Sequence, residues 1–193
     1  MIKIIFIFSF FILHPLLFGC SPVSVLASGG ATGMVVAEGD RSFGEFIDDT
    51  TIKLNISAKF LQTDNNLFIN INSNVIDGRV LLTGLVDTQE DRINIIKSVW
   101  EVKGVKEIIN EIEVGDKKTL KEYANDLWIN TQIKGLAAKT IGLRSLSYNF
   151  ETIKGKVYIA GLTSRKEQLD LLIQNVKTIK GVREIVNYVV VKE

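Results

Sequence analysis

Apolar residues recur along this chain with helical spacing in two places. A stripe at positions i, i+4 and i+7 or i+8 predicts an amphipathic helix with one face toward a core. The stripe consists of Ile52, Ile56 and Phe60 in one place and of Ile129, Ile133 and Leu136-Ala137 in the other. Asp49 and Asp126 lie just before the stripes, where we expect them to cap the helices or to interact favourably with the helix dipoles.

Two strands are predicted after each stripe. They cover residues 67–76 and 79–86 in the first place, and residues 145–153 and 156–162 in the second. The joints between them are Asp77-Gly78 and Lys154-Gly155. Because glycine readily takes the positive φ of a tight turn, each pair is predicted to be a β-hairpin.

A second helix and a last strand complete each pattern. The helix is predicted from about residue 88 to 103 in the first copy, and the inward residues of the two copies are Ile95, Ile96, Val99 and Val102, and Leu172, Ile173, Val176 and Ile179. It should end at a left-handed C′ glycine, Gly104 or Gly181. Residues 105–114 and 182–191 are rich in β-branched side chains and predict strands. The predicted fold class is α+β, with two α-β-β-α-β modules whose helices pack on one face of a small mixed sheet.

The two modules are copies of one sequence. Shifting residues 49–114 by 77 positions onto residues 126–191 needs no gap and gives 20 identical pairs among 66. Unrelated segments would share only a few, so the chain contains a tandem duplication. Three of the identical pairs consist of glycines, which we expect to be structural: Gly78, Gly84, Gly104, Gly155, Gly161 and Gly181.

The start of the chain has the layout of a signal peptide. One basic residue, Lys3, precedes fifteen mostly apolar residues from Ile4 to Phe18. This stretch is too short to span a bilayer comfortably as a permanent helix. It ends in Leu17-Phe18-Gly19-Cys20, which resembles the bacterial lipobox. The resemblance implies that residues 1–19 are removed and that Cys20 carries a lipid anchor.

Cys20 is the only cysteine of the chain. It can form neither an internal disulfide nor a metal site of several thiolates, whereas lipid attachment gives it a purpose. The open alternative is an ordinary signal peptide or membrane anchor in which the cysteine is incidental. In lipoproteins the residue after the cysteine also directs sorting, and Ser21, which is not aspartate, implies transport to the outer membrane.

The segment after the cysteine differs from the modules. Within residues 20–45, stretches rich in serine, glycine, alanine and threonine show no sustained apolar period. This composition predicts a flexible linker that lets the folded part stand off the membrane. We assign the first module to residues 46–116 and the second to residues 122–193.

Few chemical groups are available for catalysis. Removal of residues 1–19 would take Lys3 and His14, leaving 22 basic and 22 acidic side chains and no histidine. Ser-His-Asp, Cys-His and zinc-dependent sites then lack essential members. The neighbouring carboxylates of Asp48-Asp49 and of Glu90-Asp91 would point about 100° apart on a helix and do not converge. We predict a protein without enzyme activity, catalytic residues, cofactor or metal.

Binding of nucleotides or nucleic acids is also not indicated. The glycines fall singly at turns and form no phosphate-binding loop. A basic stripe interleaved with aromatic residues, the usual mark of a nucleic-acid site, is missing from the sequence. We therefore expect neither a nucleic-acid partner nor a small-molecule substrate.

Both copies carry further marks beside the hairpin glycine. Each has an apolar-x-Gly at the end of the second strand and a Gly-Val before the last strand: Leu82-Thr83-Gly84, Ile159-Ala160-Gly161, Gly104-Val105 and Gly181-Val182. Together with the order of elements, these marks resemble the BON domain over about residues 46–193. The likeness is greatest to outer-membrane lipoproteins with two BON domains, of the division-associated, lipid-binding type, on the strength of Asp40 to Gly44, Val114-Gly115 and Asn125 to Thr131.

The resemblance implies a lipid-anchored outer-membrane protein that faces the periplasm, binds anionic phospholipid through its second module and supports envelope integrity, with enrichment at the division site. A difference between the copies bears on this implication. Thr50-Thr51 of the first copy are replaced by Leu127-Trp128, on a face turned away from the core stripe. Tryptophan favours the interface between water and lipid. The open alternative is that Trp128 packs against the other module.

Charge distinguishes the copies in the same direction. Residues 119–193 hold 12 basic and 7 acidic side chains, a net charge of +5, whereas residues 46–118 hold 9 and 12, a net charge of −3. Only the second module should be attracted to an anionic surface. Ala137 and Ala138 are small where a deeply inserting helix would carry large apolar residues, so we expect shallow contact. The predicted phospholipid-binding residues are Leu127, Trp128, Thr131, Lys134, Gly135, Ala138 and Lys139.

Two other functions stay open. A protein-interaction scaffold for outer-membrane assembly proteins would use sheet edges or the surface around Trp100, although packing is the simpler interpretation of that side chain. A carboxylate-dependent cell-wall enzyme would need two carboxylates about 5 to 9 Å apart in a cleft.

Overall fold

A computed structural model of the protein describes residues 42–63 and 70–192. The predicted signal peptide, Cys20 and the predicted linker up to residue 41 lie outside the described residues, as do residues 67–69 of the first predicted strand. The described residues belong to one compact unit, which spans residues 33–193.

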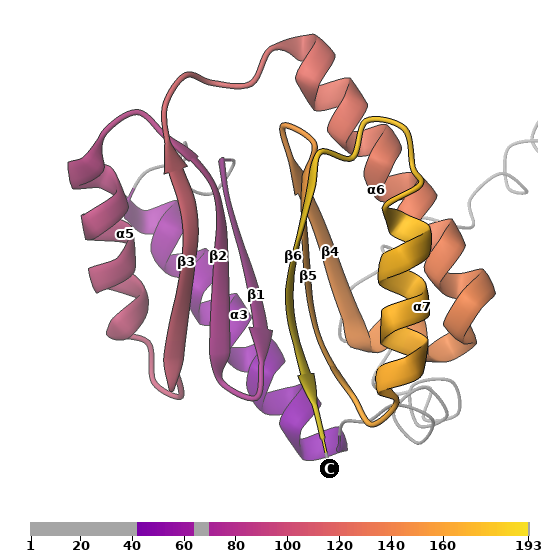
Figure 1. The fold of residues 1–193 in the computed structure, drawn as a ribbon. Helices are drawn as coiled ribbons and strands as arrows, with labels where there is room; N and C mark the ends of the chain where they lie inside the picture. The colour runs from indigo at the N-terminus through magenta and orange to yellow at the C-terminus, as the bar shows by residue number, and fades with distance from the viewer. Residues whose placement is uncertain (1–41, 64–69, 193) are drawn as a thin grey trace, which may run out of the picture. The chain divides into compact units, whose positions relative to one another are not determined.

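The first module has the predicted order α-β-β-α-β. Strand β2 is central in its sheet, with β1 antiparallel and β3 parallel to it (Figure 1). The elements are α3 (Phe43–Thr63), β1 (Ile71–Ile76), β2 (Arg79–Val86), α5 (Gln89–Trp100) and β3 (Glu107–Val114).

The second module repeats this order, and a 3-10 helix, η1, lies between its first helix and its first strand. Its sheet has β5 in the centre, β4 antiparallel and β6 parallel to it. The elements are α6 (Leu120–Ile141), η1 (Gly142–Ser147), β4 (Tyr148–Ile153), β5 (Lys156–Thr163), α7 (Lys166–Val176) and β6 (Glu184–Val191). The predicted α+β fold class and its two modules are confirmed.

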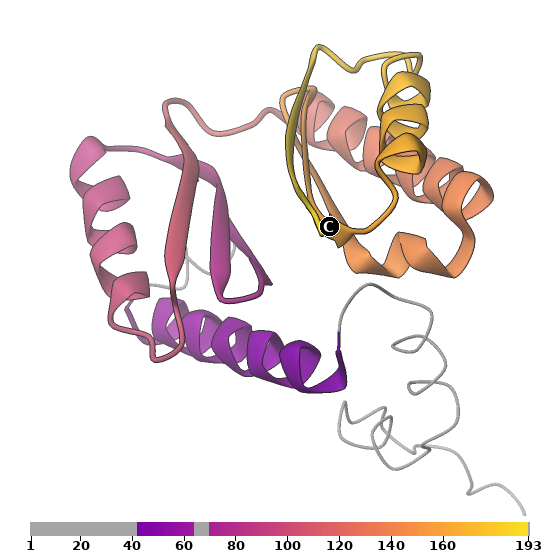
Figure 2. The same ribbon diagram turned by 60° about the horizontal axis from the view of Figure 1, so that its bottom comes forward.

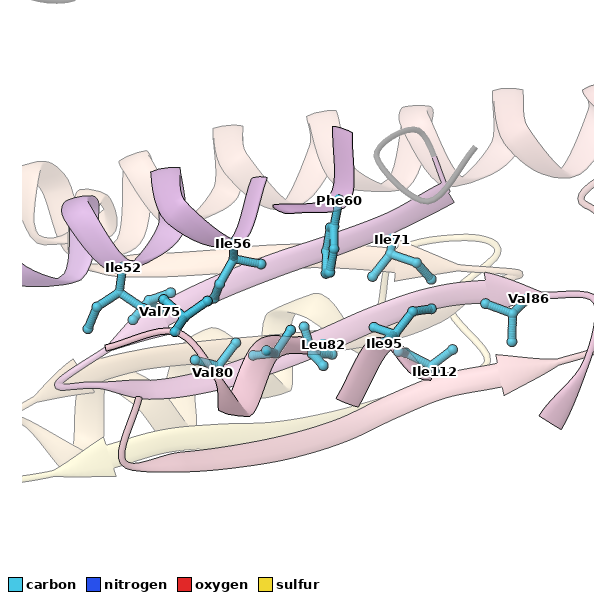
Figure 3. Close-up of a cluster of buried hydrophobic side chains, with 12 residues drawn as sticks. Ile52, Ile56, Phe60, Ile71, Val75, Val80, Leu82, Val86, Ile95 and Ile112 are labelled. Atoms are coloured by element: carbon cyan, nitrogen blue, oxygen red, sulfur yellow. The ribbon is translucent and has the colours of Figure 1, made fainter. Parts of the chain in front are cut away.

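The stripes predicted from the sequence form the two helix-side cores. Ile52, Ile56 and Phe60 of α3 are buried against side chains from α5 and from all three strands (Figure 3). Ile129 and Ile133 of α6 are fully buried in the equivalent cluster. The two helices of each module therefore cover the same face of its sheet (Figure 2). Burying each such side chain stabilises the fold by about 1.5–3 kcal/mol.

The predicted capping role of Asp49 and Asp126 is wrong. α3 begins at Phe43 and α6 at Leu120, so residues 43–45 are helical instead of belonging to the predicted linker. Each aspartate is therefore the seventh residue of its helix. Both side chains are almost fully buried.

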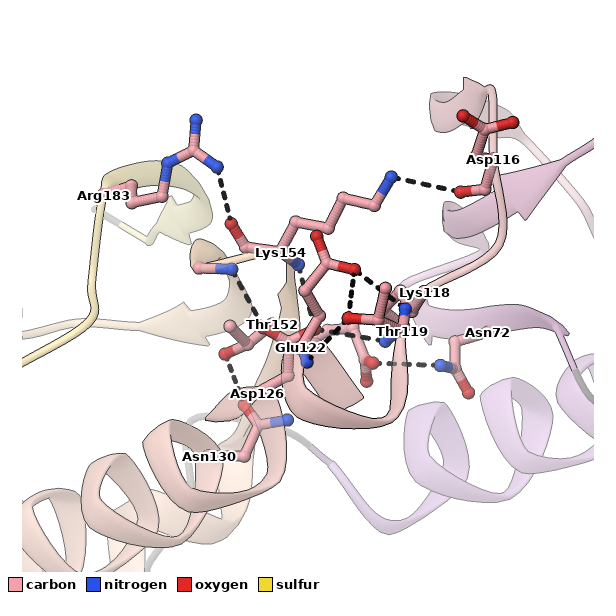
Figure 4. Close-up of polar contacts among 12 residues, drawn as sticks. Asn72, Asp116, Lys118, Thr119, Glu122, Asp126, Asn130, Thr152, Lys154 and Arg183 are labelled. Carbon is pink, nitrogen blue, oxygen red and sulfur yellow. Dashed lines mark hydrogen bonds and ion pairs between the residues drawn. The ribbon is translucent and has the colours of Figure 1, made fainter. Parts of the chain in front are cut away.

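The two aspartates instead hold the turns of the β-hairpins. One oxygen of the Asp49 carboxylate accepts a hydrogen bond from the N–H of Asp77 (2.8 Å), and the other accepts one from the N–H of Gly78 (2.9 Å). Both turn residues have positive φ, 52° and 72°, as a two-residue hairpin requires. The second module repeats both bonds, at 2.9 Å each, with Asp126, Lys154 and Gly155 (Figure 4).

The second helix of each module is shorter than predicted. α5 ends at Trp100, and the N–H of Val102 then bonds to the carbonyl three residues earlier, which brings the Val102 side chain into the core. Gly104 has a positive φ of 98°, but it lies beyond the helix, so its assignment as the C′ residue is wrong. A Cβ at this position would come within 2.9 Å of Ile52, and close packing is a further reason for glycine there. Gly181 follows α7 in the same way.

The other paired glycines also lie against neighbouring backbone. A Cβ at Gly84 would come within 2.2 Å of the Asn70 carbonyl oxygen, and one at Gly161 within 2.9 Å of the Ser147 oxygen. A Cβ at Gly78 would come within 2.8 Å of the Gly104 carbonyl oxygen, and one at Gly155 within 2.7 Å of the Gly181 oxygen. Larger residues at these four positions would push two segments of backbone apart.

Three strand starts were predicted too early. Residues 145–147 belong to η1, so the first strand of the second module begins at Tyr148. The last strands begin at Glu107 and Glu184, two residues later than expected. The C-terminal ends of all six strands, and the starts of β2 and β5, agree with the predictions to within one residue.

The sheet faces that carry no helices are also covered, which the sequence did not predict. They contribute a third apolar cluster, which joins the two modules and contains Ile76, Leu81, Leu85, Ile153, Tyr158, Ala160 and Leu162. At its rim the Glu111 carboxylate accepts hydrogen bonds from the Tyr188 hydroxyl and from Lys156. Burial and the bond to Glu111 raise the pKa of Tyr188 to about 12, so the phenol stays a neutral donor.

Candidate functional site

The outer face of α6 carries a row of exposed apolar side chains. Leu127 is 57% exposed and Trp128 46% exposed, so both point away from the core. Leu120 and Tyr123, which are 85% and 57% exposed, lie on the preceding turns. Since positions i, i+3 and i+7 share one face of a helix, Leu120, Tyr123 and Leu127 form a continuous row. We call these residues and Trp128 the α6 ridge.

Leu120 and Tyr123 were not predicted as site residues, because α6 begins six residues before Asp126. A capping box fixes this start: the Thr119 hydroxyl accepts from the N–H of Glu122, and the Glu122 carboxylate accepts from the N–H of Thr119 (Figure 4). The hydrogen bonds that the N–H and the hydroxyl of Thr119 donate to the carboxylate lower the pKa of Glu122. The spacing of threonine and glutamate three residues apart is a sequence signal for a helix start, and it would have placed both residues on the helix.

The other predicted site residues lie along the same helix. Lys134, Gly135, Ala138 and Lys139 are all exposed, and so is Thr131, whose hydroxyl donates a hydrogen bond to the Leu127 carbonyl (2.9 Å). A Cβ at Gly135 would meet nothing within 4 Å, so packing does not require a glycine there. Within the described residues, neither lysine takes part in an ion pair shorter than 4 Å.

The corresponding face of α3 is more polar at the start of the repeat. Thr50 and Thr51 replace the leucine and tryptophan, and their hydroxyls donate hydrogen bonds to the carbonyls of the preceding helical turn. α3 nevertheless exposes Leu54 and Leu61. Exposed leucine alone therefore does not separate the helices, and the distinguishing features of α6 are the tryptophan, the two lysines and the positive charge of its module.

A second exposed tryptophan lies in the first module. Trp100 is the last residue of α5 and is 51% exposed, close to the value for Trp128. Ile93, seven residues earlier on the same helix, is 43% exposed. The acidic module thus also presents an aromatic surface, without a positive net charge.

The carboxylate pairs considered for catalysis have structural contacts. Asp49 holds the hairpin turn, and Asp91 accepts a hydrogen bond from the hydroxyl of Thr88, the N-cap of α5 (2.6 Å). Across the part of the chain that the structure describes, no group of three or more carboxylate, histidine or cysteine side chains could hold a metal ion. Over the same residues, no helix combines the length and apolar character needed to cross a bilayer.

Known proteins are similar in sequence to this chain over most of its length. The BON domain family matches residues 48–116 and again residues 125–193. An uncharacterized protein from the gshII 5′ region of Anaplasma centrale is 37% identical over 147 residues, which cover 76% of this chain and 96% of that protein. The outer membrane lipoprotein DolP of Haemophilus influenzae is 26% identical over 170 residues, covering 87% and 86% of the two chains.

A third relative matches a comparable share of the chain. The osmotically-inducible protein Y of Escherichia coli is 26% identical over 159 residues, covering 81% of this chain and 79% of its own. The two family matches coincide with the two α-β-β-α-β modules of the structure. The chain therefore belongs to the BON domain family and contains two copies of the domain.

Proposed function

We propose that this protein is a non-enzymatic lipoprotein of the bacterial outer membrane that docks on anionic phospholipid through the outer face of α6 and supports envelope integrity, with enrichment at the division site. The lipid on Cys20 holds the chain at the membrane, with the modules facing the periplasm. The relative named an outer membrane lipoprotein, DolP, supports this location. The observation that carries the docking proposal is the exposed α6 ridge beside Lys134 and Lys139, within residues 119–193, whose net charge is +5.

The energies favour weak and reversible docking. Each basic residue near an anionic surface contributes about 1 kcal/mol, and the indole ring adds apolar contact at the level of the headgroups. Ala138 and Gly135 keep the middle of the face shallow, so the helix would lie in the interface without deep insertion. Tethering through Cys20 makes the docking step intramolecular, and weak contacts then suffice.

Two tryptophans of similar exposure allow a matched test. The processed chain without its lipid, starting at residue 21, is mixed with vesicles of phosphatidylcholine alone or with phosphatidylglycerol. Trp100→Phe leaves Trp128 as the only indole, and Trp128→Phe leaves Trp100. We expect a blue shift of emission only for Trp128 and only with phosphatidylglycerol. A shift of the Trp100 emission, or equal binding to neutral vesicles, contradicts the proposal.

The anchor is tested separately. Cells that express the full chain are labelled with a radioactive fatty acid, and the Cys20→Ala variant serves as the control. We expect label on the wild-type protein alone, with the protein recovered in the outer-membrane fraction. Labelling of the variant, or an unlabelled wild-type protein, would show that Cys20 is not the attachment site without affecting the docking proposal.

A protein-interaction scaffold for outer-membrane assembly proteins is the second candidate. The observation that favours it is the exposed pair Ile93 and Trp100 on α5 of the acidic module, because tryptophan is enriched among residues that dominate protein interfaces. Crosslinking in cells should then recover a protein partner from wild type and Trp128→Ala, but not from Trp100→Ala.

A further inference from the structure

The two edges of each sheet differ in their side-chain contacts to the backbone. β3 and β6 are edge strands. On each of them an asparagine side chain accepts a hydrogen bond from a backbone N–H of the same strand. The Asn110 side-chain oxygen accepts from the N–H of Ile112 (3.2 Å), and that of Asn187 accepts from the N–H of Val189 (3.0 Å). A side chain bonded to the backbone of an edge strand competes with pairing to another chain. The duplication has kept this arrangement in both modules.

β1 and β4 are the opposite edges of the two sheets, and residues of both strands line one cleft of about 740 Å³. Helices α3 and α6 also contribute side chains to the cleft. Each edge strand is six residues long, which is a usual length for a paired strand. Among the described residues, β1 and β4 carry no such asparagine contact. These two edges thus lie within a recess.

The lining of this cleft, which we call the edge cleft, has an apolar and a polar part. The apolar part consists of side chains that belong to the helix-side cores: Phe60, Ile71, Tyr148 and Phe150. The polar part faces the module interface, where the Asn72 amide donates a hydrogen bond to the Glu151 carboxylate (3.0 Å). Asn74 and Asn149 belong to the same side.

The charges of the edge cleft come from both modules. Lys53 of α3 and Lys134 of α6 both line it and are both exposed, whereas the carboxylate of Glu151 is partly buried and already bonded to Asn72. The groups best placed to meet a ligand from solvent are therefore the two ammonium groups. They would favour carboxylates on the bound molecule.

We propose that the edge cleft binds an extended peptide segment as an added β-strand. Successive side chains of a strand point to opposite sides, so the segment should alternate apolar residues, which meet the ring side, with polar residues, which meet the asparagine side. Carboxylates on the segment would pair with Lys53 and Lys134. Backbone hydrogen bonds to β1 or β4 supply affinity, and the lining selects the alternation. The segment occupies about six residues, the length of each edge strand.

The test uses the full lipidated chain in nanodiscs of phosphatidylcholine and a fluorescein-labelled octapeptide of alternating valine and aspartate or serine. Fluorescence anisotropy gives the affinity. The matched peptide has the same sequence with every backbone nitrogen methylated, which removes the N–H donors and keeps the side chains. We expect the methylated peptide to bind at least tenfold more weakly. Equal binding of the two peptides overturns the proposal.

Hydrogen exchange measured with the unmodified peptide identifies the edge. We expect slower exchange in residues 71–76 or 148–153 and no change in residues 107–114 and 184–191. Slowing confined to β3, β6 or α6 overturns the proposal, as does an absence of slowing.

Two substitutions separate peptide binding from lipid docking. Lys53→Glu should weaken peptide binding by several-fold and leave binding to phosphatidylglycerol vesicles unchanged, because Lys53 lies on α3. Trp128→Ala should weaken vesicle binding and leave peptide binding unchanged. If Trp128→Ala instead abolishes peptide binding, the peptide occupies the α6 ridge and not the edge cleft.

Discussion

The first helices of the two modules, α3 and α6, are alike where they face inward and different where they face outward. Both bury isoleucines at the first two positions of the stripe, and both place an aspartate under the hairpin turn. Outward, two threonines in α3 correspond to Leu127 and Trp128 in α6. Within one chain, the residues that the duplication kept therefore account for the fold, and those that it changed indicate where a binding function has been added.

The largest predicted effect breaks what the two helices share. Asp49→Ala or Asp126→Ala leaves two N–H groups of a hairpin turn without their acceptor. Because each buried donor left unsatisfied costs about 1–3 kcal/mol, we expect either change to lower the free energy of unfolding by about 3 kcal/mol. Urea unfolding followed by circular dichroism measures the loss.

The control for this prediction is the neighbouring carboxylate. Asp48 is exposed, so Asp48→Ala should change the free energy of unfolding by less than about 0.5 kcal/mol. A similar loss for Asp48→Ala and Asp49→Ala would mean that the general charge of the helix matters, and not the bonds to the turn.

The second prediction breaks the outward difference. Lys134→Glu with Lys139→Glu should weaken binding to phosphatidylglycerol vesicles by at least tenfold, since about 1 kcal/mol per basic residue is lost and repulsion is added. Vesicle cosedimentation at low and high salt measures it, and the wild type should lose its advantage as salt rises. The matched control is Lys53→Glu with Lys97→Glu, which reverses the charge of two exposed lysines on helices of the first module. This variant should bind as the wild type does.

Much of the fold could be predicted because it depends on local patterns. The inward stripes gave both cores, and the paired glycines gave both two-residue hairpins. The prediction for β2 gave both the first and the last residue correctly, Arg79 and Val86. These features follow from side-chain spacing and from the positive φ of turns, which a sequence displays directly.

The errors occurred where a distant contact decides the structure. The bonds from Asp49 to a turn 28 residues away cannot be inferred from helix spacing, which suggested a cap. The covered outer faces of the sheets also depend on the other module, although β2 held a signal. Its near-continuous apolar run from Val80 to Val86 is typical of a strand buried on both faces.

The candidate site was predicted in part for a similar reason. Leu127 and Trp128 differ from their repeat partners, so a comparison of the copies identified them. Leu120 and Tyr123 precede the aligned repeat, which begins at Asp126, and no partner drew attention to them. Only the capping spacing that starts at Thr119 could have placed them on the helix.

The third prediction concerns a position where α6 departs from its own helical propensity. Gly135 lies in open space, so Gly135→Ala should raise the free energy of unfolding by about 0.5–1 kcal/mol, the propensity difference between the two residues. The matched change Gly181→Ala should have the opposite sign, because that glycine has a φ of 96° and close neighbours. Thermal unfolding of both variants decides the question, and a loss of stability in Gly135→Ala would contradict the model of an unpacked outer face.

The smallest predicted effect concerns a repeat position that is polar in both copies and charged in only one. Glu151 corresponds to Asn74, and burial raises its pKa despite the opposing influence of Lys118 and Lys134. A carboxyl whose pKa is higher in the folded state binds more protons when folded, so its contribution to stability falls as pH rises from its unfolded pKa, near 4.5, through the folded value. Glu151→Gln keeps an oxygen to accept from Asn72 and removes the titration. Urea midpoints at pH 4, 5.5 and 7 should therefore show the variant gaining on the wild type as pH rises, and a constant difference would mean that the carboxyl titrates alike in both states.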